Sequence, residues 1–201
     1  MPQYPFPTDP EAVLVTDRLR LEPVRADLAP VVFELWEDAS IYRYVPEEPP
    51  PSVEWLTERY RRLETRQSTA GDQAWVQWAV RLAAEPTYVG RVEATVEAGR
   101  PAVLAWMFGS AFWRQGFGTE ATTRVLEHLA TAWGVTEAYV EIDERNVASL
   151  ALAGRLGFVE QRRVEDADFF KGTTSHERHL GRSLVDLASP AGDGRPAGYG
   201  G

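Results

Sequence analysis

The chain has 201 residues, of which 44% are apolar, carries a formal net charge of −9 and contains no cysteine. This length suits one domain with a sizeable core. The lack of cysteine excludes disulfides, thiolate metal sites and cysteinyl intermediates. The acidic balance disfavours nucleic acid as a partner, because such binding needs a basic face. It either favours a cationic substrate such as an amine or only keeps the protein soluble.

No segment predicts secretion or membrane insertion. The first residues lack a basic stretch followed by an apolar one, and no apolar run approaches the ~20 residues of a membrane span. We therefore expect a cytoplasmic protein with no membrane partner. Residues 1–12 predict a flexible Pro-rich arm, residues 13–187 a single domain, and residues 188–201, rich in glycine, a disordered tail.

The first half of the domain predicts two helices after a short strand at 18–22. Asp27 can cap the first helix, whose apolar residues recur at helical spacing: Leu28, Val31, Val32, Leu35 and Trp36. Consecutive prolines predict a loop at 45–51. Ser52 can cap the second helix, whose predicted buried face carries Trp55, Leu56, Tyr60 and Leu63.

Three consecutive strands are predicted next, at 74–83, 87–97 and 103–108. Because the turns between them are short, we expect an antiparallel meander.

The second half predicts a strand–helix–strand unit. A helix runs from Thr119 to Trp133, ends at Gly134 and leads into a strand at 137–142. This strand is expected to lie parallel to the one at 103–108. A short helix near 147–156, a strand from Phe158 and a pairing strand at 176–186 complete a mixed α/β fold.

The loop between Phe108 and Thr119 carries the sequence Arg114-Gln115-Gly116-Phe117-Gly118. A strand, a glycine-containing turn and a helix start expose unpaired N–H groups at the positive end of a helix dipole, which suits a phosphate. A dinucleotide-binding fingerprint is disfavoured because Ala121 stands at its third glycine. Nothing matches a P-loop.

A second polar segment, residues 143–149, follows the carboxyl end of the strand at 137–142. Ligands bind at such ends in open α/β sheets. Asn146 can donate and accept hydrogen bonds, and Ser149 can donate one. The alternative is that Asn146 only caps a helix and Ser149 is a residue of its first turn.

These segments together resemble the GNAT superfamily of acyl-CoA-dependent N-acyltransferases, and most of all the branch that acetylates N-terminal amines of ribosomal proteins. The resemblance covers roughly residues 14–187, and its motifs agree in order and spacing. They are Thr16-Asp17-Arg18-Leu19-Arg20-Leu21, Ala105-Trp106-Met107, Trp113-Arg114-Gln115-Gly116-Phe117-Gly118-Thr119-Glu120-Ala121, Asn146-Val147-Ala148-Ser149 and Leu156-Gly157-Phe158.

The resemblance implies a largely antiparallel sheet with a central parallel pair splayed at the cofactor site, helices on both faces, and a homodimer as one oligomeric state. It implies that acetyl-CoA is the co-substrate. Met107 and Phe108 would pair with its pantetheine arm, Asn146 would contact it, and Ser149 would donate to the departing thiolate. The pyrophosphate would be held by Arg114, Gln115, Gly116, Phe117, Gly118 and Thr119.

The base of the reaction does not transfer from the family, because residues 102–104 contain no acid. Glu93 is the candidate base, with Glu97, Glu141 and Asp143 as other acids; alternatively all are solvated and water takes the proton. Without cysteine, direct attack in a ternary complex is favoured.

His176 and His179 are three residues apart on a predicted strand and so point to opposite faces, and we expect no metal site.

The predicted function is acetyl transfer to a primary amine, either a protein N-terminus or a small molecule. The acceptor site would lie between the helices at 26–38 and 52–66, with four aromatic residues lining it or packing in the core: Trp36, Tyr42, Tyr44 and Trp55. Two alternatives stay open: a non-catalytic acyl-CoA-binding or sensing module, and a protein that holds the pyrophosphate of another nucleotide.

Overall fold

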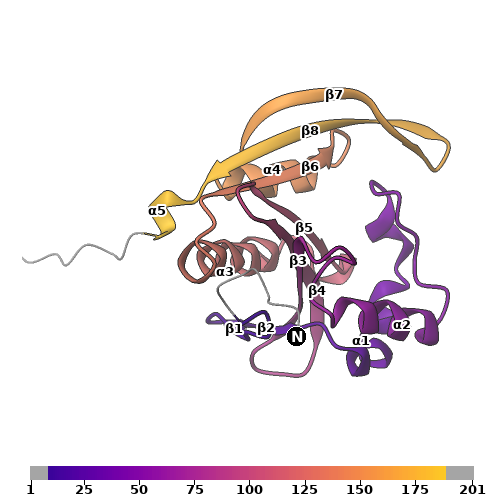
Figure 1. Ribbon diagram of the computed structural model, residues 1–201. Helices are drawn as coiled ribbons and strands as arrows, with labels where there is room; N and C mark the ends of the chain where they lie inside the picture. Colours follow the sequence, from indigo (N-terminus) through magenta and orange to yellow (C-terminus); the bar gives the residue numbers. More distant parts are fainter. Residues whose placement is uncertain (1–8, 189–201) are drawn as a thin grey trace, which may run out of the picture.

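The computed structural model describes residues 9–188, whose strands form one sheet in the order β1-β2-β3-β4-β5-β6-β8-β7 (Figure 1). The strands are β1 (Leu14–Val15), β2 (Leu19–Pro23), β3 (Gln73–Leu82), β4 (Tyr88–Glu97), β5 (Ala102–Phe108), β6 (Glu137–Asp143), β7 (Val159–Phe170) and β8 (Thr173–Ser183). The α-helices are α1 (Ala29–Trp36), α2 (Val53–Leu63), α3 (Phe117–Ala132), α4 (Val147–Arg155) and α5 (Val185–Ala188). Three short 3₁₀ turns are η1 (Ala26–Leu28), η2 (Ala39–Tyr42) and η3 (Ser110–Phe112).

The sheet is antiparallel except where β5 meets β6, as predicted. Within the described residues this parallel contact joins only Ala102 to Ala138 and Val103 to Tyr139. Beyond these pairs β5 continues beside β4 and β6 continues beside β8. The two central strands therefore part over the rest of their length, and the predicted splayed pair is confirmed.

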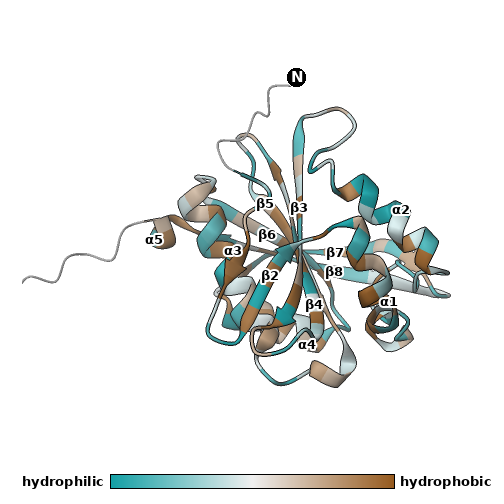
Figure 2. Cartoon of the chain, turned by 90° about the horizontal axis from the view of Figure 1, so that it is seen from below, coloured by the Kyte–Doolittle hydropathy of each residue, from teal (hydrophilic) through white to brown (hydrophobic). Residues whose placement is uncertain are grey.

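Helices cover both faces of the sheet (Figure 2). The face toward α3 carries the larger apolar core, into which α3 packs Thr122, Val125, Leu126, Leu129 and the following Trp133. The face toward α1 and α2 carries a second apolar cluster around Trp36 and Tyr60. On β4 the alternation is clear, because Val92, Ala94 and Val96 are buried under α3 and the residues between them face α2.

The helix starts confirm one predicted cap and correct another. Ser52 caps α2, since its Oγ accepts a hydrogen bond from Trp55 N at 3.2 Å. The prediction that Asp27 caps the first helix is wrong: Asp27 lies inside η1, and the chain enters α1 through Leu28 with Pro30 in the first turn. Proline suits this place because a first-turn N–H has no partner within the helix.

The burial of α2 also differs from the prediction. Leu56 and Tyr60 are buried, whereas Trp55 is 41% exposed, so its predicted place on the buried face is wrong. Residues 56 and 60 are one helical turn apart, and residue 55 falls outside that narrow stripe.

Helix α3 begins at Phe117, two residues before the predicted Thr119. Gly116 is its N-cap and takes φ 83°, a left-handed conformation that glycine adopts without strain. Phe117 is 8% exposed, so its packing extends the helix toward the loop.

The two ends of the domain are only partly described. Residues 1–8 and 189–201 lie outside the described residues, so the flexible arm and the disordered tail stay predictions there. Ala12, the last residue of the predicted arm, accepts a hydrogen bond from Trp78 Nε1 at 3.0 Å. At the other end β8 stops at Ser183 rather than 186, and the sequence analysis missed α5.

Gly90 allows β4 to approach the end of β5. A Cβ there would meet the Phe108 ring and lie 2.6 Å from Met107 O. We expect Gly90→Ala to lower the free energy of unfolding by about 1–3 kcal/mol through overpacking. Gly154 lies in α4, and a Cβ there would have open space around it. Gly154→Ala should therefore raise the free energy of unfolding by about 0.5–1 kcal/mol. Urea unfolding checks both, and equal effects would contradict this packing.

Candidate active site

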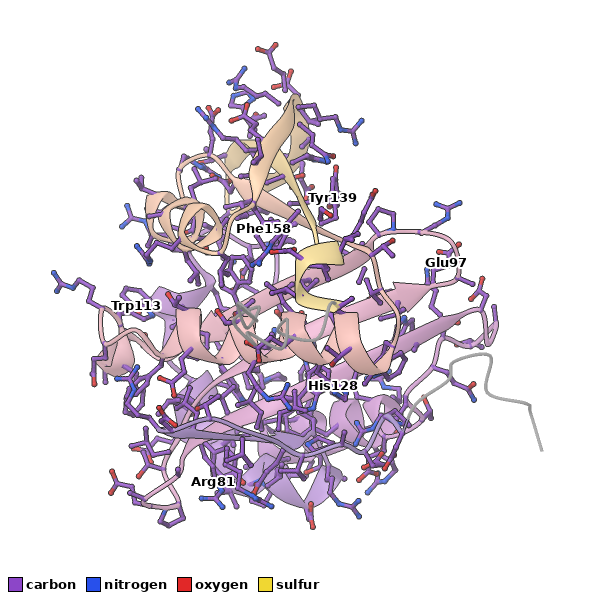
Figure 3. The ribbon with its side chains drawn as sticks, turned by 90° about the vertical axis from the view of Figure 1, so that its left-hand side faces the viewer. Arg81, Glu97, Trp113, His128, Tyr139 and Phe158 are labelled. Carbon is purple, nitrogen blue, oxygen red and sulfur yellow. The ribbon has the colours of Figure 1, made fainter. Side chains whose placement is uncertain are left out.

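The loop before α3 presents free backbone amides. None of the backbone N–H groups of residues 114–119, which end the loop and form the first turn of α3, donates a hydrogen bond to any other described residue, and the first helical bond at this end runs from Glu120 N to Gly116 O. Arg114, Gln115 and Gly116 are exposed, and Trp113 stands at the start of the helix (Figure 3). Unpaired amides at the positive end of a sixteen-residue helix can bind an anionic group such as a phosphate.

An ion pair from the other end of the domain holds this loop in place. Arg18 pairs with Glu120 at 2.5 Å, donates to Gln115 O at 3.1 Å and lies over the Phe117 ring. Thr16 Oγ1 also donates to Glu120. Burial would raise the pKa of Glu120, but the hydrogen bonds from Thr16 and Arg18 outweigh it and hold the pKa below its ordinary value.

The second small residue of the loop, Gly118, has a packing reason to be glycine. A Cβ at this position would lie 3.1 Å from Leu152 Cδ2 and 3.4 Å from Phe108 Cε2. Gly118 therefore lets α3 approach both α4 and the end of β5. This brings the amides of the loop close to the gap between β5 and β6.

The gap itself is bordered by the free edge of β5. Residues 104–108 pair with β4 on one side, and on the other side β6 has turned away after Tyr139. Met107 and Phe108 lie at this end of β5 and are 9% and 8% exposed. An unpaired strand edge offers N–H and C=O groups to any extended ligand that enters the gap.

Helix α4 forms the far wall of the gap. Asn146 caps it, because its Oδ1 accepts a hydrogen bond from Ser149 N at 3.1 Å. Trp106 Nε1 donates to Ser149 Oγ at 3.1 Å, and so a hydrogen bond from β5 reaches α4 across the gap. The indole group can only donate, so the Ser149 hydroxyl keeps its own proton for another acceptor.

On the face toward α2, the register places acidic residues on both sides of the gap. Ala105 of β5 is exposed, and Glu93 lies beside it on β4. Across the gap β6 carries Glu141, paired with His179 of β8. Glu93 accepts a hydrogen bond from Gln77, and its carboxylate is 35% exposed. A ligand above Ala105 would thus have carboxylates on two sides.

Asp143 was one of the acids predicted as a possible base, and the structure shows that its carboxylate is not free to act as one. Its carboxylate is 1% exposed and accepts hydrogen bonds from Ser175 Oγ at 2.7 Å and from Arg145 N at 2.8 Å. Burial acts to raise the pKa of Asp143, but the hydrogen bonds from Arg145 and Ser175 outweigh it and hold the pKa below its ordinary value. This carboxylate fixes the turn before α4.

Three residues on the C-terminal strands bring ligand atoms within 4.8 Å of one another: Glu141, Glu177 and His179. This cluster was not predicted from the sequence. Both ring nitrogens of His179 are engaged, Nδ1 with the Tyr139 hydroxyl and with Arg162, and Nε2 with Glu177 at 3.1 Å. Because Arg162 can only donate, we assign the lone pair to Nδ1 and the proton to Nε2. The cluster is a hydrogen-bonded network.

A buried cation fixes the helices over the face of the sheet toward α2, where the sequence predicts the acceptor site and which we call the acceptor face. Arg91 of β4 donates to Glu47 at 2.7 Å and lies over the Trp36 ring, while Arg59 of α2 pairs with the other Glu47 oxygen at 2.6 Å. Burial opposes the charge of Arg91, but Glu93 and Glu47 outweigh it and raise the pKa of the guanidinium. The loop before α2 is thereby held against the sheet.

The aromatic residues proposed to line the acceptor site divide into two groups. Trp36 and Tyr42 are 1% and 2% exposed and belong to the core, where Tyr42 OH donates to Trp36 O. Burial raises the pKa of Tyr42 to about 12. Tyr44 and Trp55 are the two that reach the surface.

The β7–β8 hairpin reaches over to the same loop (Figure 1). Lys171 at its tip donates to three backbone carbonyl oxygens, Tyr42 O at 3.0 Å, Val45 O at 2.7 Å and Glu47 O at 2.8 Å. Its ammonium is also 3.3 Å from Glu48. The hairpin and the loop therefore close one side of the acceptor face together.

Comparison with known proteins identifies the family. The acetyltransferase (GNAT) domain model matches residues 18–159, which is more than half of the chain. The chain belongs to the GNAT acetyltransferase family. Within the described residues, no helix is long and apolar enough to cross a membrane.

Individual relatives of the GNAT chain are distant in sequence. The uncharacterized N-acetyltransferase YoaA of Bacillus subtilis (strain 168) is 22% identical over 163 residues, which cover 80% of this chain and 90% of that protein. Spermidine N-acetyltransferase from Vibrio cholerae, solved with CoA and spermine, superposes with a TM-score of 0.73 at 19% identity, covering 87% of this chain and 100% of that one.

A third relative has a comparable fold. The Salmonella typhimurium acetyl transferase that modifies the N-terminal serine of a 50S ribosomal subunit protein has a TM-score of 0.73 at 16% identity, over 86% of this chain and 99% of that chain. At such identities the two solved structures show the fold.

The structure brings most of the predicted site residues of this GNAT domain together. The loop residues 114–119 stand at the α3 terminus, Met107 and Phe108 at the parted end of β5, and Asn146 and Ser149 on the far wall. Sequence reasoning missed the contact of Trp106 with Ser149. Its only signal was the place of Trp106 in the Ala-Trp-Met motif.

Asp143 should stabilise the fold only where it is ionised. Asp143→Asn should lower the free energy of unfolding by about 1–3 kcal/mol at pH 7, because charge-assisted hydrogen bonds are lost. Since the folded pKa lies below the unfolded value near ~3.9, the difference should be complete above that value and vanish as the pH falls through the folded pKa. Asp17→Asn, at an exposed position, is the control. Urea unfolding from pH 7 to 2 tests this, and a pH-independent difference would refute it.

Proposed function

We propose that this GNAT protein transfers the acetyl group of acetyl-CoA to a primary amine by direct attack in a ternary complex. The single observation that carries the proposal is that β5 and β6 part directly beside the free amides of residues 114–119. A phosphate site and an open strand edge at one end of the same gap suit a long ligand with an anionic end and an extended arm.

Each part of the gap has a role in this proposal. The amides of residues 114–119 hold the diphosphate, and the free edge of β5 at Met107 and Phe108 pairs with the pantetheine arm. Asn146 contacts the arm from the far wall. The thioester then lies near Ala105, where the acceptor reaches it from the face toward α2.

The reaction moves two protons and exchanges one bond. The amine nitrogen attacks the thioester carbonyl carbon, and the carbon–sulfur bond breaks. Glu93 takes the proton that the amine loses, and the Ser149 hydroxyl donates to the departing thiolate. An N-terminal amine, with a pKa near ~8, needs less help from a base than an alkylamine near ~10.

The acceptor is a primary amine of a protein N-terminus or of a small molecule. The acidic residues on both sides of Ala105 and the net charge of −9 favour a cationic acceptor. A cytoplasmic location and a homodimer stay predictions from the sequence.

Substitution in the loop tests the co-substrate. Gly116→Val forces a β-branched residue into φ 83° and places a Cβ 3.3 Å from Arg18, so the loop amides must shift. We expect the Kd for CoA, measured by calorimetry, to rise about tenfold or more as amide–phosphate hydrogen bonds are lost.

The matched control is Gly99→Val, which carries the same strain at φ 73° in open space far from the loop. It should leave the Kd unchanged. A thiol-release assay over a panel of amines completes the test: CoA binding without turnover on any amine would favour a sensing module, and no CoA binding would overturn the proposal. If ATP or NAD displaced CoA at equal concentration, the loop would hold another pyrophosphate.

The base is tested by the pH dependence of the reaction. If Glu93 accepts the proton, Glu93→Gln should lower kcat by about 10²-fold or more and remove the acidic limb of the kcat profile. Glu97→Gln is the control, because Glu97 lies on the same strand and face and makes the same kind of contact, with Gln73. An unchanged acidic limb in Glu93→Gln would eliminate Glu93 and leave water as the acceptor.

A further inference from the structure

A cavity of about 270 Å³ opens on the acceptor face beside Ala105. Its floor is formed by β3, β4 and β5, and Leu63 at the end of α2 closes one side. Apolar groups of Trp75 and Val103 line it, and its polar groups are contributed by Gln77, Glu93 and Thr95. The cavity extends from β5, at the parted strands, to β3, two strand spacings or about 9–10 Å away.

Gln77 holds an unsatisfied oxygen in this cavity. The side chain is 3% exposed, and its Oε1 accepts no hydrogen bond from any described residue. Its Nε2 donates to the Glu93 carboxylate. A carboxylate can only accept, so this contact fixes the amide orientation and keeps Oε1 turned away from Glu93. A buried carbonyl oxygen without a donor costs free energy that a bound N–H group would recover.

A second glutamine on the same strand shows that the unpaired amide oxygen is specific to Gln77. Gln73 also donates through Nε2 to an acid of β4, Glu97, at 3.3 Å. Its Oε1, however, accepts a hydrogen bond from Trp75 Nε1 at 3.1 Å. The two glutamine–glutamate pairs have the same hydrogen bond. Of the two, the pair in the cavity is the one whose glutamine oxygen, Gln77 Oε1, accepts no hydrogen bond from any described residue.

The acid beside Gln77 is Glu93, whose charge is shared with Arg91. Among the described residues Glu93 makes one hydrogen bond, the one with Gln77, and it lies 3.8 Å from Arg91 Nε, beyond hydrogen-bond distance. Arg91 directs its Nη2 to Glu47 instead. The Gln77 amide and the Glu93 carboxylate, which also forms an ion pair with Arg91, both line the cavity, and a ligand that binds to their oxygens must donate N–H bonds.

We propose that this cavity binds a second, non-reacting ammonium group of the acceptor. The inference rests on the proposed function, since it places the reacting amine above Ala105. The second ammonium donates to Gln77 Oε1 and is attracted by Glu93. The methylene chain between the two nitrogens packs on Trp75 and Val103. The preferred acceptor is a diamine whose nitrogens span up to two strand spacings.

Comparing 1,6-diaminohexane with hexylamine isolates the second ammonium, since the two differ only at the distal end. Binding to the CoA-loaded protein is measured by calorimetry, and acetylation by thiol release, so that affinity and turnover are read separately. We expect the wild-type protein to bind the diamine about tenfold more tightly than the monoamine, as for one hydrogen bond to a charged group.

Gln77→Leu should abolish this preference by weakening the binding of the diamine to the level of the monoamine. Gln77→Met, unbranched and equally long, provides a second variant in case leucine disturbs the sheet. Gln73→Leu is the matched control: Gln73 lies outside the cavity lining, and its loss removes only the side-chain hydrogen bonds with Glu97 and Trp75, so the preference should be kept.

The outcomes separate the two proposals. A diamine preference that depends on Gln77 but comes without any acetylation supports the cavity and overturns the proposed function. If the protein acetylates amines but binds the diamine and the monoamine with equal affinity, the assignment of the cavity is overturned and the proposed function stands. A preference that survives both Gln77 variants also overturns the cavity assignment.

Discussion

The parting of β5 and β6 after two residue pairs is the constraint on which the rest of the site depends. Neighbouring parallel strands normally stay paired, because each backbone N–H and C=O then has a partner. Here β5 stays paired with β4 and β6 stays paired with β8, so that the backbone groups on the outer edges of the two strands keep their hydrogen bonds where the strands part. The inner edge of β5 is left for a ligand, and the α3 terminus stands at the open end of the same gap.

Side chains then fix the two halves of the sheet relative to each other. The Trp106–Ser149 hydrogen bond spans the gap on the side of α4, and Lys171 ties the β7–β8 hairpin to the loop before α2 on the opposite side. Arg91 and Glu47 hold that loop against β4. These contacts join the elements on the two sides of the gap, which favours a preorganised site over one assembled by the ligand.

The strands, the long helices and the loop at 114–119 could be predicted because they depend on local patterns: alternation, helical spacing, and glycine before a helix. The predicted cap at Asp27 was wrong because the chain forms a 3₁₀ turn around Asp27 and α1 begins only after Leu28, with Pro30 in its first turn. Contacts between residues far apart in the sequence, such as Gln77 with Glu93 or Trp106 with Ser149, depend on how the strands and helices are placed beside one another. The spacing of residues along the sequence does not indicate them. Glu93 was predicted to face away from Val92, and its neighbours could only come from the fold.

Lys171 is the one lysine of the chain, and the other twenty basic residues are arginines. Its ε-amine is engaged by three carbonyl oxygens at the hairpin tip. For the proposed transfer to an amine, the chain thus has one side-chain amine of its own, and that nitrogen is occupied by hydrogen bonds to carbonyl oxygens. Under the proposed function, the composition and the hairpin together leave no free lysine side chain among the described residues as a competing acceptor.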